Sequence, residues 1–352
     1  MVTTRRLTEG FAAVALGAVA VGAIFTGAKG FAPKGDNHPY IPTVNAIGVP
    51  AGSYAPGADT TSARKISSIP VISWHQMDNG CKATATLCTD PDYAGTNVTQ
   101  RQFYNEINWL YAHGYRTVTT AQYVAWAGGE NVLLPAKPVL LTVDDGIANF
   151  YAGATPVLKH FGFTMVSMVA SGFAQGAQDK ERQYQGWDAT WTQLRSLPSD
   201  VWQFAFHAGP EGHVAQQGHC HYFYTCQRTG ESDAAYQARV TADISAGIAT
   251  EQRELGDRVN TELWAVPYND LAQDNTEPQS GTDPAKWLLD YAEQKFSVVF
   301  VDGQTTRNNQ HYRYEVHGTD SLAFFAEQIE RSDVYTKYPS PATGLARAGG
   351  ES

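Results

Sequence analysis

The stretch PVLLTVDDG, residues 138–146, decides the fold. Its first six residues form the continuous apolar run that is typical of a strand buried on both faces, as in a parallel sheet. The Asp-Asp-Gly that follows is first of all a turn signal. Because residues 154–162 have the pattern of a helix, this turn joins a strand to a helix and is not a hairpin.

Strands and helices are expected to alternate along the rest of the chain. Further strands are predicted at 69–75, 164–170, 202–207, 262–268 and 296–301, and helices near 99–114, 234–255, 284–294 and 321–332. Thr99 and Gln102 have the spacing of a helix-capping box, and Gly114 is a suitable helix stop. The alternation predicts a parallel sheet or an α/β barrel, whose reactive side chains lie at the C-terminal ends of the strands.

Composition indicates the domain organisation. The 352 residues carry a formal net charge of −10, which argues against nucleic acid or an anionic lipid surface as a broad partner. Residues 1–28 have two arginines followed by an uncharged run, the layout of a cleaved export signal or an N-terminal membrane anchor, so we expect a secreted or cell-surface protein. Residues 29–65 read as a flexible linker and 339–352 as a disordered tail, which leaves 66–338 as a single catalytic domain.

The four cysteines fall into two close pairs. An oxidising compartment favours the disulfides Cys81–Cys88 and Cys220–Cys226. The alternative makes Cys220 a metal thiolate beside the neighbouring histidines, residues 219 and 221. That alternative leaves Cys226 as a free thiol outside the cell, so we interpret the two histidines as loop residues.

Polar side chains at the expected strand ends have the composition of a metal site. If Asp144 and Asp145 turn toward one pocket, their repulsion raises one pKa unless a cation lies between them. His207 ends a strand, and the glycines at 209 and 212 allow a tight loop that returns His213 close to it. Two imidazoles and one carboxylate, with a fourth position left to water, form a catalytic zinc arrangement. Glu211 is a reserve ligand.

Three segments together resemble the polysaccharide deacetylases with a NodB homology domain, carbohydrate esterase family 4. LTVDDG at 141–146 looks like the first motif of that family, in which the first Asp is the base and the second binds metal. FHAGPEGH at 206–213 looks like the second motif, two metal-binding histidines that are normally closer together. AVPY at 265–268 is similar to the third motif, RxPY, with Ala265 in place of the Arg that orients the base. The resemblance spans about residues 69–329, and it implies the distorted (β/α) barrel of the family.

The resemblance is strongest to the branch that acts on poly-N-acetylglucosamine. It implies a secreted metal-dependent enzyme that removes N-acetyl groups from a carbohydrate polymer. The catalytic acid would be His75, as in that branch, or His317, as in most other members. The remaining implied roles are Zn²⁺, Co²⁺ or Ni²⁺ on Asp145, His207 and His213, the base Asp144, and an oxyanion donor at the backbone near Tyr268.

Two other functional classes remain open from the residues. A catalytically silent carbohydrate-binding protein would keep the barrel without a metal, and Ala265 favours it. A metal-free glycoside hydrolase would need a second acid several ångströms from Asp144 on a different strand. Of the aromatic residues near the expected rim, Trp74 and Tyr268 are the two that we expect to contact sugar. Retention of zinc would separate the deacetylase from both alternatives.

Overall fold

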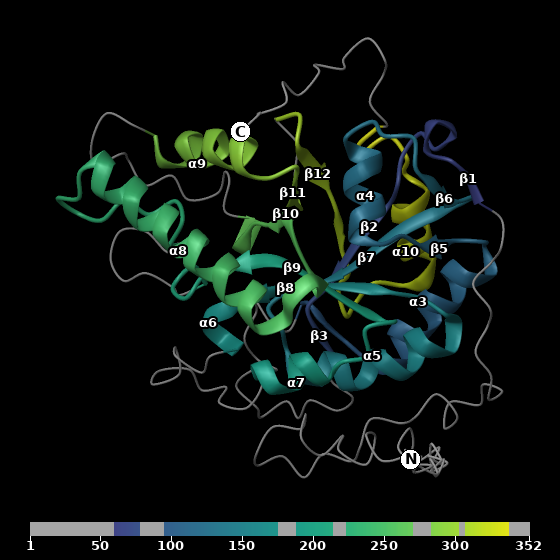
Figure 1. The fold of residues 1–352 in the computed structure, drawn as a ribbon. Coiled ribbons are helices and arrows are strands. Elements are labelled where there is room, and N and C mark those ends of the chain that lie inside the picture. The colour runs from purple at the N-terminus through teal and green to yellow at the C-terminus, as the bar shows by residue number, and fades with distance from the viewer. Residues whose placement is uncertain are drawn as a thin grey trace, which may run out of the picture.

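Parallel strands form the centre of the molecule, and helices surround them (Figure 1). The computed structural model describes residues 60–77, 95–174, 188–213, 223–269, 283–302 and 307–337. The main sheet has the order β12-β11-β10-β9-β8-β7-β2-β13, with β5 beside β7, and every pairing in it is parallel. Its strands are β2 (Val71–Trp74), β5 (Arg116–Thr117), β7 (Pro138–Val143), β8 (Met165–Ala170), β9 (Trp202–Ala208), β10 (Val259–Ala265), β11 (Val298–Val301), β12 (Gln310–Tyr312) and β13 (Tyr314–Glu315).

One continuous segment, residues 310–315, brings the two ends of this sheet together. Its first half, β12, pairs with β11, and its second half, β13, pairs with β2. Arg313 is the single residue between the two halves. The sheet is therefore a nearly closed barrel, which confirms the predicted distorted (β/α) barrel.

The helices follow the strands in the predicted alternation. Thr99 caps the helix that begins at Gln100, since its hydroxyl accepts a hydrogen bond from the backbone N–H of Gln102. The Gln102 side-chain amide donates to Glu106 and to the carbonyl of His317, which ties this helix to the closing segment. The helices are α3 (Gln100–Ala112), α4 (Thr120–Ala127), α5 (Ala148–Phe161), α6 (Ser171–Ala174), α7 (Trp191–Ser196), α8 (Asp233–Leu255), α9 (Pro284–Lys295) and α10 (Leu322–Glu330).

Both faces of strand β7 are buried, which explains its unbroken apolar run. Leu140 belongs to a cluster of side chains from β2, β8, β9, β10 and β11, which meet inside the barrel. Val139, Leu141 and Val143 belong to a second cluster between the sheet and helices α3 and α5. Alternation along the strand thus places the residue after Val143 on the barrel side.

The ordered domain includes six residues that composition placed in the linker. Thr60–Ser62 form β1, which pairs antiparallel with β6 (Leu133–Pro135). Ala63–Lys65 form a 3₁₀ turn, η3, in which Ala63 is fully buried. The expected linker boundary at residue 65 is therefore wrong for residues 60–65. Their Gly- and Pro-free sequence, TTSARK, differs from the Gly/Pro-rich stretch before it.

Several expectations fall on residues outside the described part of the chain. They are the export segment 1–28, the linker up to residue 59, the tail 339–352, Cys81, Cys88, Cys220 and the histidines at 219 and 221. Cys226 is buried and is not a free thiol, but the pairing of both disulfides stays a prediction. Among the described helices, none has the length and apolarity to cross a membrane.

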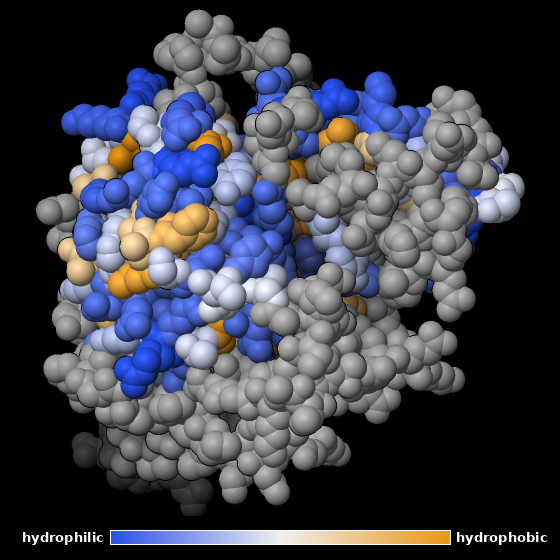
Figure 2. Space-filling model, turned by 180° about the vertical axis from the view of Figure 1, so that it is seen from behind, coloured by the Kyte–Doolittle hydropathy of each residue, from blue (hydrophilic) through white to orange (hydrophobic). Residues whose placement is uncertain are grey.

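The described surface seen from behind is mostly hydrophilic, with small hydrophobic patches (Figure 2). Few large apolar side chains are exposed among the described residues: Leu133, Tyr268, Leu322 and Phe324. Scattered exposure of this kind is ordinary for a protein surface. Of these four, only Tyr268 belongs to an element at the site described below.

A buried acid on α8 is the clearest electrostatic cost in the described fold. Glu251 is 0% exposed, and neither carboxyl oxygen has a hydrogen-bond partner among the described residues. Burial raises the pKa of Glu251 well above its usual 4.5. Because the unfolded chain ionises above about pH 4.5 and the folded chain resists doing so, stability falls as the pH rises above that value.

Replacing Glu251 with Met should therefore raise the free energy of unfolding at pH 8, by more than about 1 kcal/mol, since each unit of pKa shift is worth about 1.4 kcal/mol. The gain should shrink toward pH 4.5. Urea denaturation at the two pH values measures it, with Glu254→Met on the same helix as the control because Glu254 forms a surface ion pair with Arg195. A Glu251→Met variant that is no more stable at pH 8 than at pH 4.5, relative to wild type, would contradict this account.

Candidate metal and catalytic site

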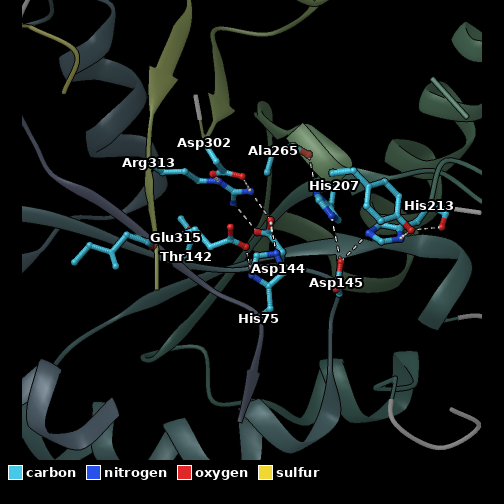
Figure 3. A network of polar contacts seen from close by, with 12 residues as sticks. His75, Thr142, Asp144, Asp145, His207, His213, Ala265, Asp302, Arg313 and Glu315 are labelled. Atoms are coloured by element: carbon cyan, nitrogen blue, oxygen red, sulfur yellow. Dashed lines mark hydrogen bonds and ion pairs between the residues drawn. The ribbon is translucent and has the colours of Figure 1, made fainter. Parts of the chain in front are cut away.

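Polar side chains from several strands meet at the C-terminal end of the barrel (Figure 3). They divide into two groups that share neighbouring residues of one turn, Asp144 and Asp145. One group surrounds Asp145 and contains two histidines. The other surrounds Asp144 and contains an arginine and a third histidine. The rest come from the residue after β2 (His75), β9 (His207), the loop after β9 (His213), η5 after β10 (Pro267–Asn269, with Tyr268), the residue after β11 (Asp302) and the closing segment (Arg313 and Glu315).

The turn after β7 sends the two neighbouring carboxylates in different directions. Alternation places Asp144 toward the barrel interior and would place Asp145 on the opposite face. Asp145 instead adopts φ +71°, in the left-handed region that non-glycine residues rarely occupy, and Gly146 follows at φ +88°. The backbone N–H of Asp144 donates to the carbonyl of Trp74 at 3.0 Å, which fixes the turn to the end of β2. Asp144 therefore lies beside Arg313 while Asp145 lies beside the two histidines, at the same end of the barrel.

Asp145, His207 and His213 form the one described group of potential metal ligands. The Nε2 atoms of His207 and His213 lie 3.2 Å and 2.9 Å from the same oxygen, Oδ1 of Asp145. All three residues are buried. The two histidines therefore lie close together in spite of their six-residue separation. The glycines of the loop had predicted this approach.

Hydrogen bonds on the far side of each imidazole determine which nitrogen carries the proton. His207 Nδ1 lies 2.8 Å from the carbonyl of Ala265, so this nitrogen is the donor. The Tyr268 hydroxyl donates to the carbonyl of His213 and therefore accepts from His213 Nδ1 at 2.8 Å. Both Nε2 atoms are left with lone pairs that face Asp145.

The arrangement fits a divalent metal ion. Two imidazole lone pairs and a carboxylate oxygen are three acceptors at close range, and Oδ1 of Asp145 is buried without a hydrogen-bond donor among the described residues. A cation among them resolves this conflict. Two histidines and a carboxylate are a common catalytic donor set for zinc, and imidazoles whose other nitrogen is held by an acceptor are typical of such sites.

Glu211, the reserve ligand, does not join this group. Its side chain is 63% exposed and lies 3.8 Å from Arg228. Its backbone N–H donates a hydrogen bond to Asp243 on α8. His213, and not Glu211, is therefore the third member of the group around Asp145.

Arg313 donates two hydrogen bonds to Asp144, and the sequence did not predict this contact. Its Nη1 and Nη2 donate to the two oxygens of Asp144 at 2.6 and 2.5 Å, and its Nε donates to Asp302 at 2.7 Å. Arg313 and Asp144 are each 1% exposed. Burial would raise the pKa of Asp144, but Arg313 and then His207 outweigh it and hold the pKa below its usual value. Asp144 is thus ionised and fixed in orientation.

The arginine that contacts Asp144 thus comes from another strand and not from the motif position at Ala265. Ala265 is the last residue of β10, and its carbonyl accepts a hydrogen bond from His207 Nδ1. Arg313 enters the barrel from the junction of β12 and β13, about 170 residues from Asp144. A sequence signal existed, since Arg313 and Glu315 are charged residues at alternate positions of the strand-like stretch HYRYEV, but that stretch is short and lies outside every expected strand.

His75 faces the second side of Asp144. Its Nε2 lies 3.7 Å from Asp144 Oδ2, and its Nδ1 lies 3.2 Å from Oε1 of Glu315, an ion pair without the alignment of a hydrogen bond. Burial would lower the pKa of His75, but Glu315 and then Asp144 and Asp145 raise it above its usual value. The imidazolium form, which can give up a proton, is favoured.

The competing histidine lies farther out. His317 Nε2 is 3.7 Å from Glu315 Oε2, and its side chain is 45% exposed. His75, by contrast, lies beside Asp144 (Figure 3). The geometry favours His75 over His317 as the acid.

The two aromatic residues expected to contact sugar differ. Tyr268 is 42% exposed, with φ +56° and its ring 4.3 Å from that of His213. Trp74 is fully buried, and its Nε1 donates to Glu106 at 3.0 Å. The expectation for Trp74 is wrong, because a residue pointing outward from β2 toward α3 packs into the core between sheet and helix.

Known proteins are similar to this chain in sequence and in fold. No family model matches the chain. A relative from Escherichia coli K12, "Poly-beta-1,6-N-acetyl-D-glucosamine N-deacetylase", is 26% identical over 216 residues, which cover 56% of this chain and 30% of that protein. This chain therefore spans less than a third of the length of that relative.

Solved structures share the fold. A de-N-acetylase from Aggregatibacter actinomycetemcomitans superposes with a TM-score of 0.58 at 20% identity, covering 74% of this chain and 99% of that one. IcaB from Ammonifex degensii gives a TM-score of 0.53 at 21% identity, covering 75% and 97%. By sequence the chain is similar to a poly-β-1,6-N-acetyl-D-glucosamine N-deacetylase, and it shares its fold with these solved deacetylase structures.

Proposed function

We propose that this protein is a metal-dependent N-deacetylase of a polysaccharide that contains N-acetylglucosamine. The observation that supports it most is the convergence of two imidazole lone pairs on Asp145 beside an ionised, arginine-held Asp144. The name of the E. coli relative makes poly-β-1,6-N-acetyl-D-glucosamine the first candidate substrate. The proposed metal ligands are Asp145, His207 and His213, with Zn²⁺ as the first candidate and Co²⁺ or Ni²⁺ as alternatives.

Asp144 is the proposed base. A divalent metal ion, when bound, polarises the acetamide carbonyl and lowers the pKa of a water molecule toward neutrality. Asp144 takes the proton from that water as it attacks the carbonyl carbon. The two hydrogen bonds from Arg313 use one lone pair on each carboxylate oxygen, so each oxygen keeps another for the water. The same bonds lower the basicity of Asp144 while fixing its direction.

His75 is the proposed acid, and Glu315 supports it. Collapse of the tetrahedral intermediate needs a proton on the leaving amine, and the raised pKa of His75 keeps that proton available. Glu315 approaches Nδ1, which leaves Nε2 directed at Asp144 and the reaction centre. A backbone N–H near Tyr268 remains the proposed donor to the oxyanion.

Export belongs to the same proposal. Residues 1–28 would act as a cleaved signal or a membrane anchor, and the disulfides Cys81–Cys88 and Cys220–Cys226 would form outside the cytoplasm. The partner would be the exported N-acetylated polymer. The alternative of a silent binding protein rested on Ala265, and the placement of Arg313 on Asp144 removes that support.

Activity and metal content test the proposal together. We expect about one zinc per chain by mass spectrometry, and acetate release from β-1,6-linked N-acetylglucosamine oligomers that is lost on chelation. His207→Ala should lose both the metal and the activity, because it removes one of three ligands. His317→Ala is the matched control and should keep the metal. A wild-type protein that binds no metal after incubation with Zn²⁺, Co²⁺ or Ni²⁺ would overturn the proposal.

Arg313 should be needed for both rate and pH response. Arg313→Ala should lower kcat by at least about tenfold, because a positioned base contributes 10² to 10⁴ and loses its orientation here. Arg313→Lys should not restore the rate, since a single ammonium cannot make the two parallel bonds. The pKa of Asp144 should rise without the guanidinium, so the acidic limb of kcat/KM should move to higher pH.

Arg307→Ala, which breaks a surface ion pair with Asp290, is the control for the loss of an arginine. Thermal unfolding of each variant separates a folding defect from a rate defect. An Arg313→Ala enzyme with wild-type kcat and an unmoved acidic limb would show that Asp144 does not depend on Arg313.

Glu315 should set the alkaline limb of the profile. Since Glu315 raises the pKa of His75, Glu315→Gln should lower that pKa and move the alkaline limb of kcat/KM to lower pH, while the acidic limb stays in place. The measurement is kcat/KM from pH 5 to 10 on one oligomer. A shift in the opposite direction would rule out His75 as the group observed. So would the same shift when Glu315→Gln is made in the His75→Gln background.

A further inference from the structure

Two residues outside the three motif segments, Tyr224 and Asp243, contact the loop between the two histidines. It runs from the end of β9 at Ala208 to His213 and includes Gly209, Pro210, Glu211 and Gly212. Only His213 depends on it for position, because His207 lies within β9 itself. Whatever fixes the loop therefore fixes one proposed ligand and not the other.

Asp243 and Tyr224 accept hydrogen bonds from the backbone N–H groups at the start of this loop, and Tyr268 donates to the carbonyl of His213 at its end. Asp243 Oδ1 accepts from the backbone N–H of Glu211 at 2.8 Å, and Tyr224 Oη accepts from the backbone N–H of Gly209 at 2.9 Å. The Tyr224 hydroxyl donates its own proton to Asp243 Oδ2 at 2.9 Å. One carboxylate thus holds the loop directly and also through the tyrosine.

The fit between loop and helix is too close for side chains. A Cβ on Gly209 would lie 2.2 Å from both the backbone and the carboxylate of Asp243, and a Cβ on Gly212 would lie 2.0 Å from Tyr224 Oη. One helical turn beyond Asp243, a Cβ on Gly247 would lie 2.7 Å from the Cα of Gly209. The glycines in the loop sequence HAGPEGH are therefore required by contact with Asp243, Tyr224 and α8.

We infer that Asp243 is a positioning residue for the metal ligand His213, acting through its hydrogen bonds to the loop and to Tyr224. This inference rests on the proposed metal site. Asp243 and Tyr224 are buried, and hydrogen bonds to a carboxylate are stronger than those between neutral groups. Loss of Asp243 removes the acceptor of the Glu211 N–H and leaves the buried Tyr224 hydroxyl without its partner, which is costly, so it should release the loop rather than leave it in place.

The alternative is that Asp243 only stabilises the fold. The two roles differ in what they predict for zinc. A residue that supports a ligand from behind typically changes metal affinity by 10- to 100-fold when it is removed. A residue that only stabilises the fold changes the free energy of unfolding of the metal-free protein and leaves the affinity of the folded protein unchanged.

The experiment is a double-mutant cycle on zinc affinity. Zn²⁺ dissociation constants are measured by competition with a chromogenic chelator for wild type, Asp243→Ala, His213→Ala and the double variant, at a temperature where circular dichroism shows all four folded. We expect Asp243→Ala to weaken zinc binding by 10- to 100-fold in the wild-type background and by less than about twofold in the His213→Ala background, because the supported ligand is then absent. Asp243→Asn, which keeps an acceptor for the N–H of Glu211, should recover part of the loss.

Glu254→Ala is the matched control. It is an acidic residue on the same helix, about 16 Å along the axis from Asp243, and its partner is the surface residue Arg195. It should leave the zinc affinity unchanged. Tyr224→Phe removes the second contact with the loop without removing the ring, and it should weaken zinc binding by less than Asp243→Ala does.

The outcomes separate this inference from the proposed function. Wild-type protein that binds no zinc refutes the metal site itself, and with it this role of Asp243. Wild-type protein that binds zinc, with Asp243→Ala folded and equally tight, refutes the role of Asp243 alone. An equal loss of affinity in both backgrounds also refutes it, because Asp243 would then act on the site by a route that does not pass through His213.

Discussion

The ion pair between Arg313 and Asp144 joins the strand that closes the barrel to the turn that carries the proposed base. The sheet ends at β12 and β13, and Arg313 is the residue at which one becomes the other. Its guanidinium is buried and bonded to Asp144 and Asp302. Removing one partner of such a pair leaves an uncompensated buried charge, which is far more costly than loss of a surface pair. One side chain thus links the segment that closes the barrel to the proposed base.

The second constraint is the backbone of Asp145. A regular strand would direct Asp144 and Asp145 to opposite faces, and only one of them would reach the end of the barrel. The left-handed conformation of Asp145, followed by Gly146, turns the second carboxylate toward the histidines. Strain of this kind persists only where surrounding structure enforces it, and it is commonly found at functional sites. Here the bond from Asp144 to the carbonyl of Trp74 anchors the turn.

The sequence predicted those parts of the structure that have local signals. The apolar run of β7, the longer strands and helices β8, β9, β10, β11, α5, α8, α9 and α10, and the approach of His213 to His207 all follow from periodicity, turn residues and short motifs. The positions of Arg313, Glu315 and Asp243 do not, because each contacts a residue that is distant in the sequence and that only the tertiary fold brings near it. Arg313 sits in a strand of three residues followed by one of two, too short for a periodic pattern. The error at Trp74 has the opposite cause: an aromatic residue beside a site residue was read as part of the site, whereas alternation turns it into the core.

The central claim is that Asp145, His207 and His213 hold one divalent metal ion beside Asp144. Anomalous diffraction at the zinc absorption edge, from crystals of the zinc-loaded protein, tests it most directly. The account predicts a single strong peak within bonding distance of Asp145, His207 Nε2 and His213 Nε2, with Asp144 still bonded to Arg313. A peak bound to other residues, or no peak at this end of the barrel, would contradict it.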